Sequence, residues 1–198
     1  MKIADRAAAA AARGFLVALA GALAGAGCVS TADQPFPLDG GEAAAVKLGD
    51  YHCKMFDSRG VASTAAARLD RSGGLGKAQY AFRSADGPEI SPIALRKVAP
   101  GVYLAAAAHS DGAGEDVLLV RLAAGGAAFT ILAIDDAATE QAEALAAKRG
   151  ATFKRSPLGD EMDGPVEAQR AFLSDLAAKP TLWRTTAECR AGASRRAR

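Results

Sequence analysis

Gly49-Asp50-Tyr51-His52-Cys53 and Gly101-Val102-Tyr103 open two similar stretches of this chain, and this repeat decides the predicted fold. Each Gly-x-Tyr is followed by an Arg-Leu pair and a Gly-Gly pair, at an offset of 52 or 53 residues between the copies (49 to 101, 68 to 121, 73 to 125). These later landmarks are Arg68-Leu69 and Gly73-Gly74 in the first copy, and Arg121-Leu122 and Gly125-Gly126 in the second. The region from 41 to 134 therefore predicts a duplicated unit.

Each copy has the pattern of a three-stranded antiparallel meander. A strand begins at the tyrosine, a polar turn follows, and a second strand ends at Arg-Leu. The Gly-Gly pair supplies the positive φ that a tight hairpin needs, and a third strand carries an aromatic residue, Tyr80 or Phe129. Residues 89–98 predict a lead-in strand to the second copy. Six to eight strands would form one strongly bent sheet or a small barrel, and pairing the two copies would remove exposed edges.

Two helices are expected after the meanders. Asp136 can cap the first helix, which ends at Gly150 after a basic last turn, as the helix dipole favours. The second helix begins at Gly164-Pro165 and ends at Lys179-Pro180. Its apolar side chains recur at helical spacing and predict a face that packs on the sheet: Phe172, Leu173 and Leu176. The predicted fold class is α+β, with an antiparallel sheet or small barrel of about six to eight strands and two helices packed on it.

The N-terminal segment has the pattern of a bacterial export signal. Basic residues precede an Ala/Leu-rich run from 14 to 24, which has about the length of a signal-peptide core and is short for a membrane span. Gly25-Ala26-Gly27-Cys28 resembles the lipobox of bacterial lipoproteins, with Gly25 where leucine is usual. We therefore expect residues 1–27 to be a lipoprotein signal peptide and Cys28 to carry palmitate-type acyl chains. Ordinary signal cleavage is one alternative and would yield a soluble periplasmic or secreted protein; an uncleaved membrane anchor is another.

The chain has 3 cysteines, and this odd number bears on the same question. If Cys28 carries a thioether-linked lipid, Cys53 and Cys189 remain to form a disulfide in the oxidising compartment outside the cytoplasm. Two separate buried thiols are the alternative. A lipid with several acyl chains would hold the protein stably on its membrane.

The mature chain is expected to be one domain with little net charge. Residues 28–40 would be a tether, residues 41–189 a single α+β domain, and residues 190–198 a basic disordered tail. Removal of residues 1–27 leaves 24 − 3 = 21 basic and 22 − 1 = 21 acidic side chains. This balance argues against nucleic acid as a partner.

These features together resemble uncharacterised proteobacterial lipoproteins. The shared features are a signal that ends in cysteine, a Gly-x-Tyr-x-Cys opening at 49–53, a strand-rich middle and a closing helix such as 167–173. The resemblance implies no known activity. Val29, rather than aspartate, follows Cys28, and by the same resemblance this implies the outer membrane, with the domain facing the periplasm.

Patterns of catalytic and metal sites are weak in this sequence. Residues 73–78 lack the spacing of a phosphate loop, and there is no Gly-x-Ser-x-Gly elbow. Cys53, His109 and an aspartate could be drawn together as a nucleophilic arrangement. The histidines, His52 and His109, lack the paired spacing of metal ligands. We therefore predict no catalytic, cofactor-binding or metal-binding residues.

The leading hypothesis is a non-catalytic envelope protein. It would bind the membrane through the lipid on Cys28 and an unknown protein or envelope partner through its sheet. One alternative is an envelope hydrolase that uses the thiol of Cys53 or the imidazole of His109. Another is a small barrel that holds an apolar ligand.

Overall fold

The computed structural model describes eight segments of the chain. They are residues 29–33, 35–36, 42–57, 59–72, 78–84, 89–108, 114–156 and 159–192. Several features of the sequence lie outside the described residues: the predicted signal peptide, Cys28, the Gly73-Gly74 turn, His109 and the last six residues, 193–198.

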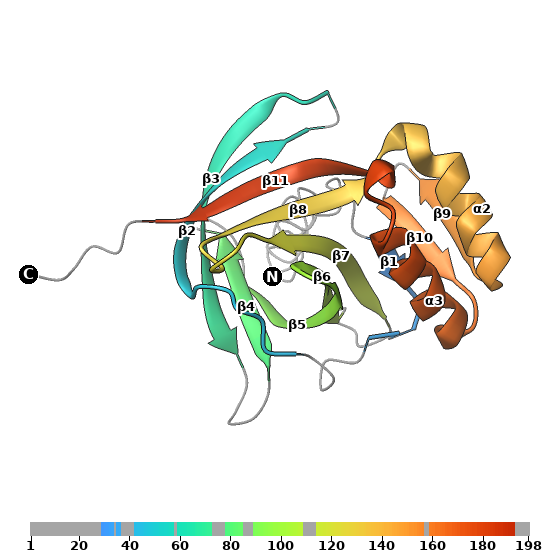
Figure 1. Cartoon of the computed structure of the whole chain (residues 1–198), viewed down its shortest axis with the longest axis horizontal. Coiled ribbons are helices and arrows are strands. Elements are labelled where there is room, and N and C mark those ends of the chain that lie inside the picture. Colours follow the sequence, from blue (N-terminus) through green and yellow to red (C-terminus); the bar gives the residue numbers. More distant parts are fainter. Residues whose placement is uncertain are drawn as a thin grey trace, which may run out of the picture.

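Eight strands close into a ring, which is a small barrel (Figure 1). They are β2 (Gly49–Phe56), β3 (Ala62–Ser72), β4 (Gln79–Ser84), β5 (Glu89–Ala99), β6 (Val102–Ala108), β7 (Glu115–Leu122), β8 (Ala128–Ile134) and β11 (Trp183–Ala191). Their order is β6-β5-β4-β3-β2-β11-β8-β7, and antiparallel pairing of β6 with β7 completes the ring. The predicted α+β class with a small barrel is confirmed.

The two meanders are β2–β3–β4 and β6–β7–β8, and β5 is the lead-in strand between them. The first two strands of each copy pair in the same register: Gly49 with Leu69 and Tyr51 with Ala67 in the first copy, and Gly101 with Leu122 and Tyr103 with Val120 in the second. The sequence offset of 52 or 53 residues thus corresponds to a repeated pattern of strand pairing.

The third strands correspond differently from the prediction. Phe82 lies opposite Leu69, and Phe129 lies opposite Leu122, so Phe82 rather than Tyr80 is the counterpart of Phe129. The reason is the longer first hairpin: β3 continues to Ser72 before the chain turns, whereas β7 ends at its Arg-Leu pair.

The barrel interior is filled by side chains from all eight strands. Tyr51 and Phe129 belong to this cluster and pack with ring centroids 5.0 Å apart. Its other members include Cys53, Ala67, Leu69, Tyr80, Leu95, Tyr103, Ala105, Val120, Ile131, Ala187 and Cys189. Burial of this apolar surface is the main favourable contribution to barrel stability.

A strap formed by residues 42–48 covers one end of the barrel. Its first backbone N–H, on Glu42, donates to the Leu95 carbonyl, and the N–H of Lys47 donates to the Gly126 carbonyl. The phenol of Tyr80 accepts a hydrogen bond from the N–H of Ala44 at 2.9 Å. The strap therefore joins β5 to the β7–β8 turn and satisfies a tyrosine hydroxyl of the interior.

Three short strands form a wing that extends from the barrel. They are β1 (Val29–Thr31), β10 (Gly159–Asp163) and β9 (Thr152–Ser156). The first half of β7 pairs with β1, the second half pairs with β8, and β1 pairs in parallel with β10. Residues 29–31 therefore belong to the sheet and not to the expected tether. They pair with the first half of β7, whose edge is not paired with β8. At the other end, Arg190 and Ala191 of the expected tail lie in β11.

The two expected helices are α2 (Thr139–Arg149) and α3 (Val166–Ala177), each near a short 3-10 turn: η2 (Asp136–Ala138) and η3 (Pro180–Leu182). Asp135, not Asp136, caps this region, because its side chain accepts the N–H of Ala137. Gly150 ends α2 with φ 79°, as predicted. The predicted face of α3 is buried in a second core that lies on the outer side of β6, β7 and β8 and under the wing: Phe172, Leu173 and Leu176. Neither helix has the length and apolar character of a membrane span, in the part of the chain that the structure describes.

Candidate functional site

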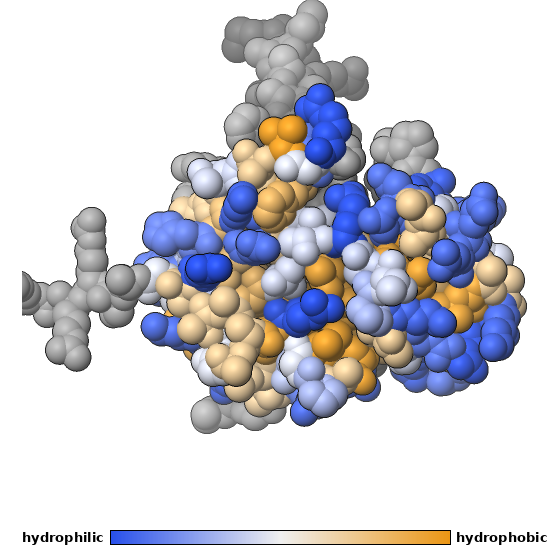
Figure 2. All heavy atoms as spheres, turned by 45° about the horizontal axis from the view of Figure 1, so that its top comes forward, coloured by the Kyte–Doolittle hydropathy of each residue, from blue (hydrophilic) through white to orange (hydrophobic). Residues whose placement is uncertain are grey.

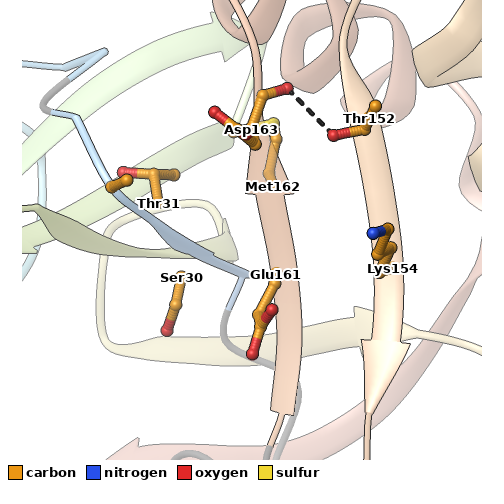
Figure 3. Close-up of a pocket in the computed structure, with 8 residues that line it drawn as sticks. Ser30, Thr31, Thr152, Lys154, Glu161, Met162 and Asp163 are labelled. Carbon is orange, nitrogen blue, oxygen red and sulfur yellow. Dashed lines mark hydrogen bonds between the residues drawn. The ribbon is translucent and has the colours of Figure 1, made fainter.

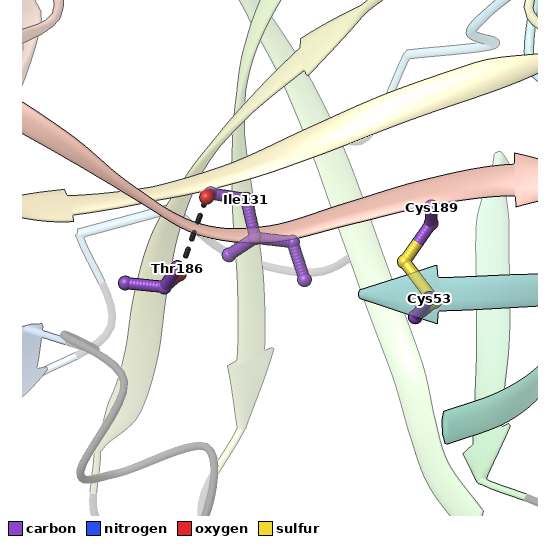
Figure 4. Close-up of a disulfide and its surroundings, with 4 residues drawn as sticks. All are labelled: Cys53, Ile131, Thr186 and Cys189. Atoms are coloured by element: carbon purple, nitrogen blue, oxygen red, sulfur yellow. Dashed lines mark hydrogen bonds between the residues drawn. A yellow bond between two sulfur atoms is a disulfide. The ribbon is translucent and has the colours of Figure 1, made fainter. Parts of the chain in front are cut away.

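The two paired cysteines lie inside the barrel (Figure 4). Cys53 of β2 lies directly opposite Cys189 of β11, with a Cα–Cα distance of 4.0 Å, and their sulfur atoms are bonded. Both residues are buried. The predicted disulfide is confirmed, and it leaves no free thiol at Cys53 for the nucleophile considered above.

His52 does not assemble with these cysteines. His52 is exposed on β2, and it precedes the inward-facing Cys53, so its side chain points to the opposite face of the strand. His109 lies outside the described residues. Among the residues that the structure does describe, no three His, Cys, Asp or Glu side chains gather to hold a metal ion.

The wing carries a groove with a volume of about 410 Å³ (Figure 3). It lies along β1, β10 and β9, and its lining is mostly polar: Ser30, Thr31, Ala32, Thr152, Lys154, Glu161, Met162 and Asp163. We call this surface the groove. The sequence does not predict this surface, because residues 160–163 have the composition of a solvated acidic loop yet form β10.

Four side chains form a polar row across the groove and the strand beside it. Register places Asp116 of β7 next to Ser30, Ser30 next to Glu161, and Glu161 next to Lys154. The Ser30 hydroxyl donates to the Asp116 carboxylate at 2.5 Å. Lys154 and Glu161 are exposed and form no ion pair with each other at 4.0 Å or less, although they are opposite in charge and adjacent in register. The row therefore offers a cation and an anion to a ligand.

The polar row continues the inner face of the barrel wall. Leu118, two residues along β7 from Asp116, packs against the interior cluster of the barrel. Val29 and Met162, which alternate with the row, belong to the core under the helices. One face of the wing is thus packed in the core with α3, and the opposite face carries the groove.

An ion-pair network holds the packed side of the wing. Arg155 of β9 makes two hydrogen bonds to the buried Asp160 of β10, at 2.8 and 3.0 Å, and a third to the carbonyl of Ile134 at 3.0 Å. It also forms an ion pair with Asp136. Hydrogen bonding to the Asp160 carboxylate raises the pKa of Arg155, against the desolvation that lowers it. This bidentate contact ties the β9–β10 hairpin to the end of β8.

The segment that follows β1 is pinned by a buried carboxylate. Glu115 of β7 is 1% exposed, and its Oε1 accepts the backbone N–H of Phe36 at 2.7 Å. The hydroxyl of Thr31 donates to the Glu115 carbonyl at 3.3 Å. These bonds hold β1 in its place between the barrel and β10.

No known protein family, curated protein or solved structure matches this chain. The disulfide, the packed barrel and the groove are the three features that bear on function.

Proposed function

We propose that this chain is a lipid-anchored protein of the bacterial cell envelope, on the outer membrane and facing the periplasm, and that it serves as a non-catalytic binding or scaffolding module. The observation that carries this proposal is the bond between Cys53 and Cys189. Structural disulfides are typical of proteins outside the cytoplasm. The bond also uses two of the 3 cysteines and leaves Cys28, at the end of the apolar run, for the lipid.

The barrel supports a binding role more than either alternative. Cys53 has no free thiol for a hydrolase. Buried side chains, among them Tyr51 and Tyr80 at 1% exposure, occupy the interior where an apolar ligand would lie. Recognition therefore falls to the outer surfaces of the protein.

One such surface is the outer part of the β2–β3 hairpin. Residues 62–66 of β3 are exposed and pair with β2, and among the described residues the pairing with β4 runs from Ala67 to Ser72. Val61 at the turn is 59% exposed, and Figure 2 shows apolar residues interspersed with charged ones over the barrel. Strand edges of this kind accept an added strand from a partner.

The turn of this hairpin is held by one carboxylate. Asp57 accepts the backbone N–H groups of Val61 and Arg59, at 2.8 and 2.9 Å. The bond from Val61 is the main cause that holds the pKa of Asp57 below its ordinary value. The hairpin is thus a preformed projection, which lowers the entropy cost of binding a partner.

The proposal is tested with the Cys28→Ser variant in bacterial cells. We expect the variant to lose its acyl mass and to leave the membrane fraction, because the lipid supplies the anchoring free energy. The control is the double variant Cys53→Ser/Cys189→Ser, which keeps Cys28 and should stay acylated and on the membrane. Unchanged electrophoretic mobility and membrane fractionation of the Cys28 variant would refute the proposal.

A further inference from the structure

The folded sheet begins at the residue that follows the proposed lipid site. Val29 opens β1, is 2% exposed, and pairs with Val117 on one side and Asp160 on the other. Consecutive Cα atoms are about 3.8 Å apart, so Cys28 is within one residue of a strand held on both sides. A free tether over residues 28–40 would have reached roughly 45 Å. Pairing of β1 removes that freedom.

The packed side of β1 leaves no room for acyl chains. Val29 belongs to the core that includes Phe172 and Leu173 of α3. Acyl chains on Cys28 would therefore extend toward a bilayer on the side of β1 opposite this core. That side carries the groove, and Ser30, two residues from Cys28, is part of its wall.

We propose that the groove face of the wing lies against the headgroups of the bilayer that holds the lipid of Cys28, an inference that rests on the proposed function. The domain would then sit on the membrane surface in one orientation. Lipid attachment and headgroup contact would act as two linked interactions, and the second becomes effectively intramolecular.

The charges of the groove match zwitterionic headgroups. Lys154 supplies an ammonium for a lipid phosphate, and Glu161 and Asp163 supply carboxylates for a lipid ammonium. The hydroxyls of Ser30 and Thr152 add hydrogen-bonding groups. The exposed large apolar residues of the described chain, Leu48 and Val61, are outside the groove, so the face is suited to contact with headgroups and not to insertion.

The orientation is tested with the acylated full-length protein in vesicles of phosphatidylethanolamine and phosphatidylcholine. A fluorophore is attached to Thr152→Cys in the groove, or to Ala124→Cys in the β7–β8 turn, and is quenched by headgroup-labelled lipids. Ala124 is exposed and lies seven residues beyond Val117, about 20 Å further along the barrel. We expect several-fold stronger quenching at position 152 than at position 124.

Three further variants extend this test. A twelve-residue Gly/Ser insertion between Cys28 and Val29 adds a reach of about 40 Å, and should reduce the difference between the two positions. Lys154→Glu should weaken quenching at position 152 by removing the cation that faces lipid phosphate. Lys148→Glu, an exposed change of the same charge on α2, should leave the quenching unchanged.

The outcomes separate this inference from the proposed function. If mass spectrometry finds no acyl group on Cys28, both fall together. If the protein is acylated but positions 152 and 124 are quenched equally, the lipid anchor stands and the orientation is wrong. Stronger quenching at 152 that is insensitive to Lys154→Glu would also overturn the role given to the groove charges.

Discussion

Two neighbouring glycines in the β7–β8 turn have different functions. Gly125 and Gly126 both have positive φ, 79° and 67°. A Cβ on Gly125 would meet nothing within 4 Å, whereas a Cβ on Gly126 would lie 1.7 Å from the carbonyl oxygen of Ala45 in the strap. Gly125 is therefore required only for the backbone conformation of the turn. At Gly126 the missing side chain also lets the strap pass close to the turn.

The pair allows a matched comparison at the scale of single residues. Gly125→Ala should cost about 1 kcal/mol of unfolding free energy, from the left-handed backbone alone. Gly126→Ala should cost roughly 3 kcal/mol or more, because the strap must also move from the barrel end. Urea unfolding of the two variants measures the difference. Equal urea midpoints of unfolding for the two variants would show that the contact between the strap and Gly126 does not contribute to stability.

The sequence predicts the turn at these glycines but not their contact with the strap. The Gly-Gly pair indicates a tight turn, because few other residues adopt positive φ. The close approach of the strap at Ala45 has no local signal, since it depends on where the distant residues 42–48 cross the barrel.

At the scale of elements, β11 contains one extra residue between Trp183 and Cys189. Thr185 lies opposite Leu132, but Ala187 lies opposite Ile131, so Thr186 is a β-bulge and its hydroxyl donates to the Ile131 carbonyl at 3.2 Å (Figure 4). Trp183 packs against the outer core, while Ala187 and Cys189 pack inside the barrel. The bulge therefore moves the odd-numbered residues from the outer face to the inner face.

Deletion of Thr186 should remove the bulge and leave Cys189 in place. Trp183 lies opposite Ile134 and Cys189 lies opposite Phe129, two residues that are five positions apart on β8. Without Thr186, Cys189 is also five positions from Trp183, so it should keep its partner, face the interior and still bond to Cys53. Thiol titration of the denatured, unreduced protein should find the same number of free thiols in the deletion variant, in Thr186→Ala and in the parent. Two additional free thiols in the deletion variant would contradict this account of the bulge.

Elements with a repeated or periodic pattern were predictable, and short paired ones were not. The meanders and the apolar face of α3 follow from recurrence within the sequence itself. β1 and β10 have only three and five residues, and they are strands because β7 and β9 pair with them. Isolated strands of this length have no stability of their own, so local sequence carries little signal for them.

At the scale of the whole molecule, the disulfide joins the first meander to the last strand. It closes a loop with a sequence separation of 136 residues. Cross-linking a loop of this length removes conformational entropy from the unfolded chain and contributes about 5 kcal/mol in the chain-entropy model. The bond also sits where β11 completes the ring between β2 and β8.

Removal of the bond should therefore lower the stability of the entire barrel. We expect Cys53→Ala/Cys189→Ala to lose about 5 kcal/mol or somewhat less, because two small cavities add to the loss and residual structure in the unfolded chain offsets it. The measurement is thermal or guanidinium unfolding followed by circular dichroism. A double variant with the unfolding midpoint of the parent would show that the disulfide does not stabilise the barrel.

The sequence by itself determined the duplicated meander, the lead-in strand, both helices and the pairing of Cys53 with Cys189. These features follow from the residues that form tight turns, from the helical spacing of apolar residues, and from the odd number of cysteines, one of which is at the predicted lipid site. Only the tertiary structure decided that the strands close into a ring, that the strap seals it, and that β1 and β10 build a grooved wing. Each of these depends on hydrogen bonds between residues far apart in the chain, and a one-residue change of register in any strand would turn its side chains to the other face.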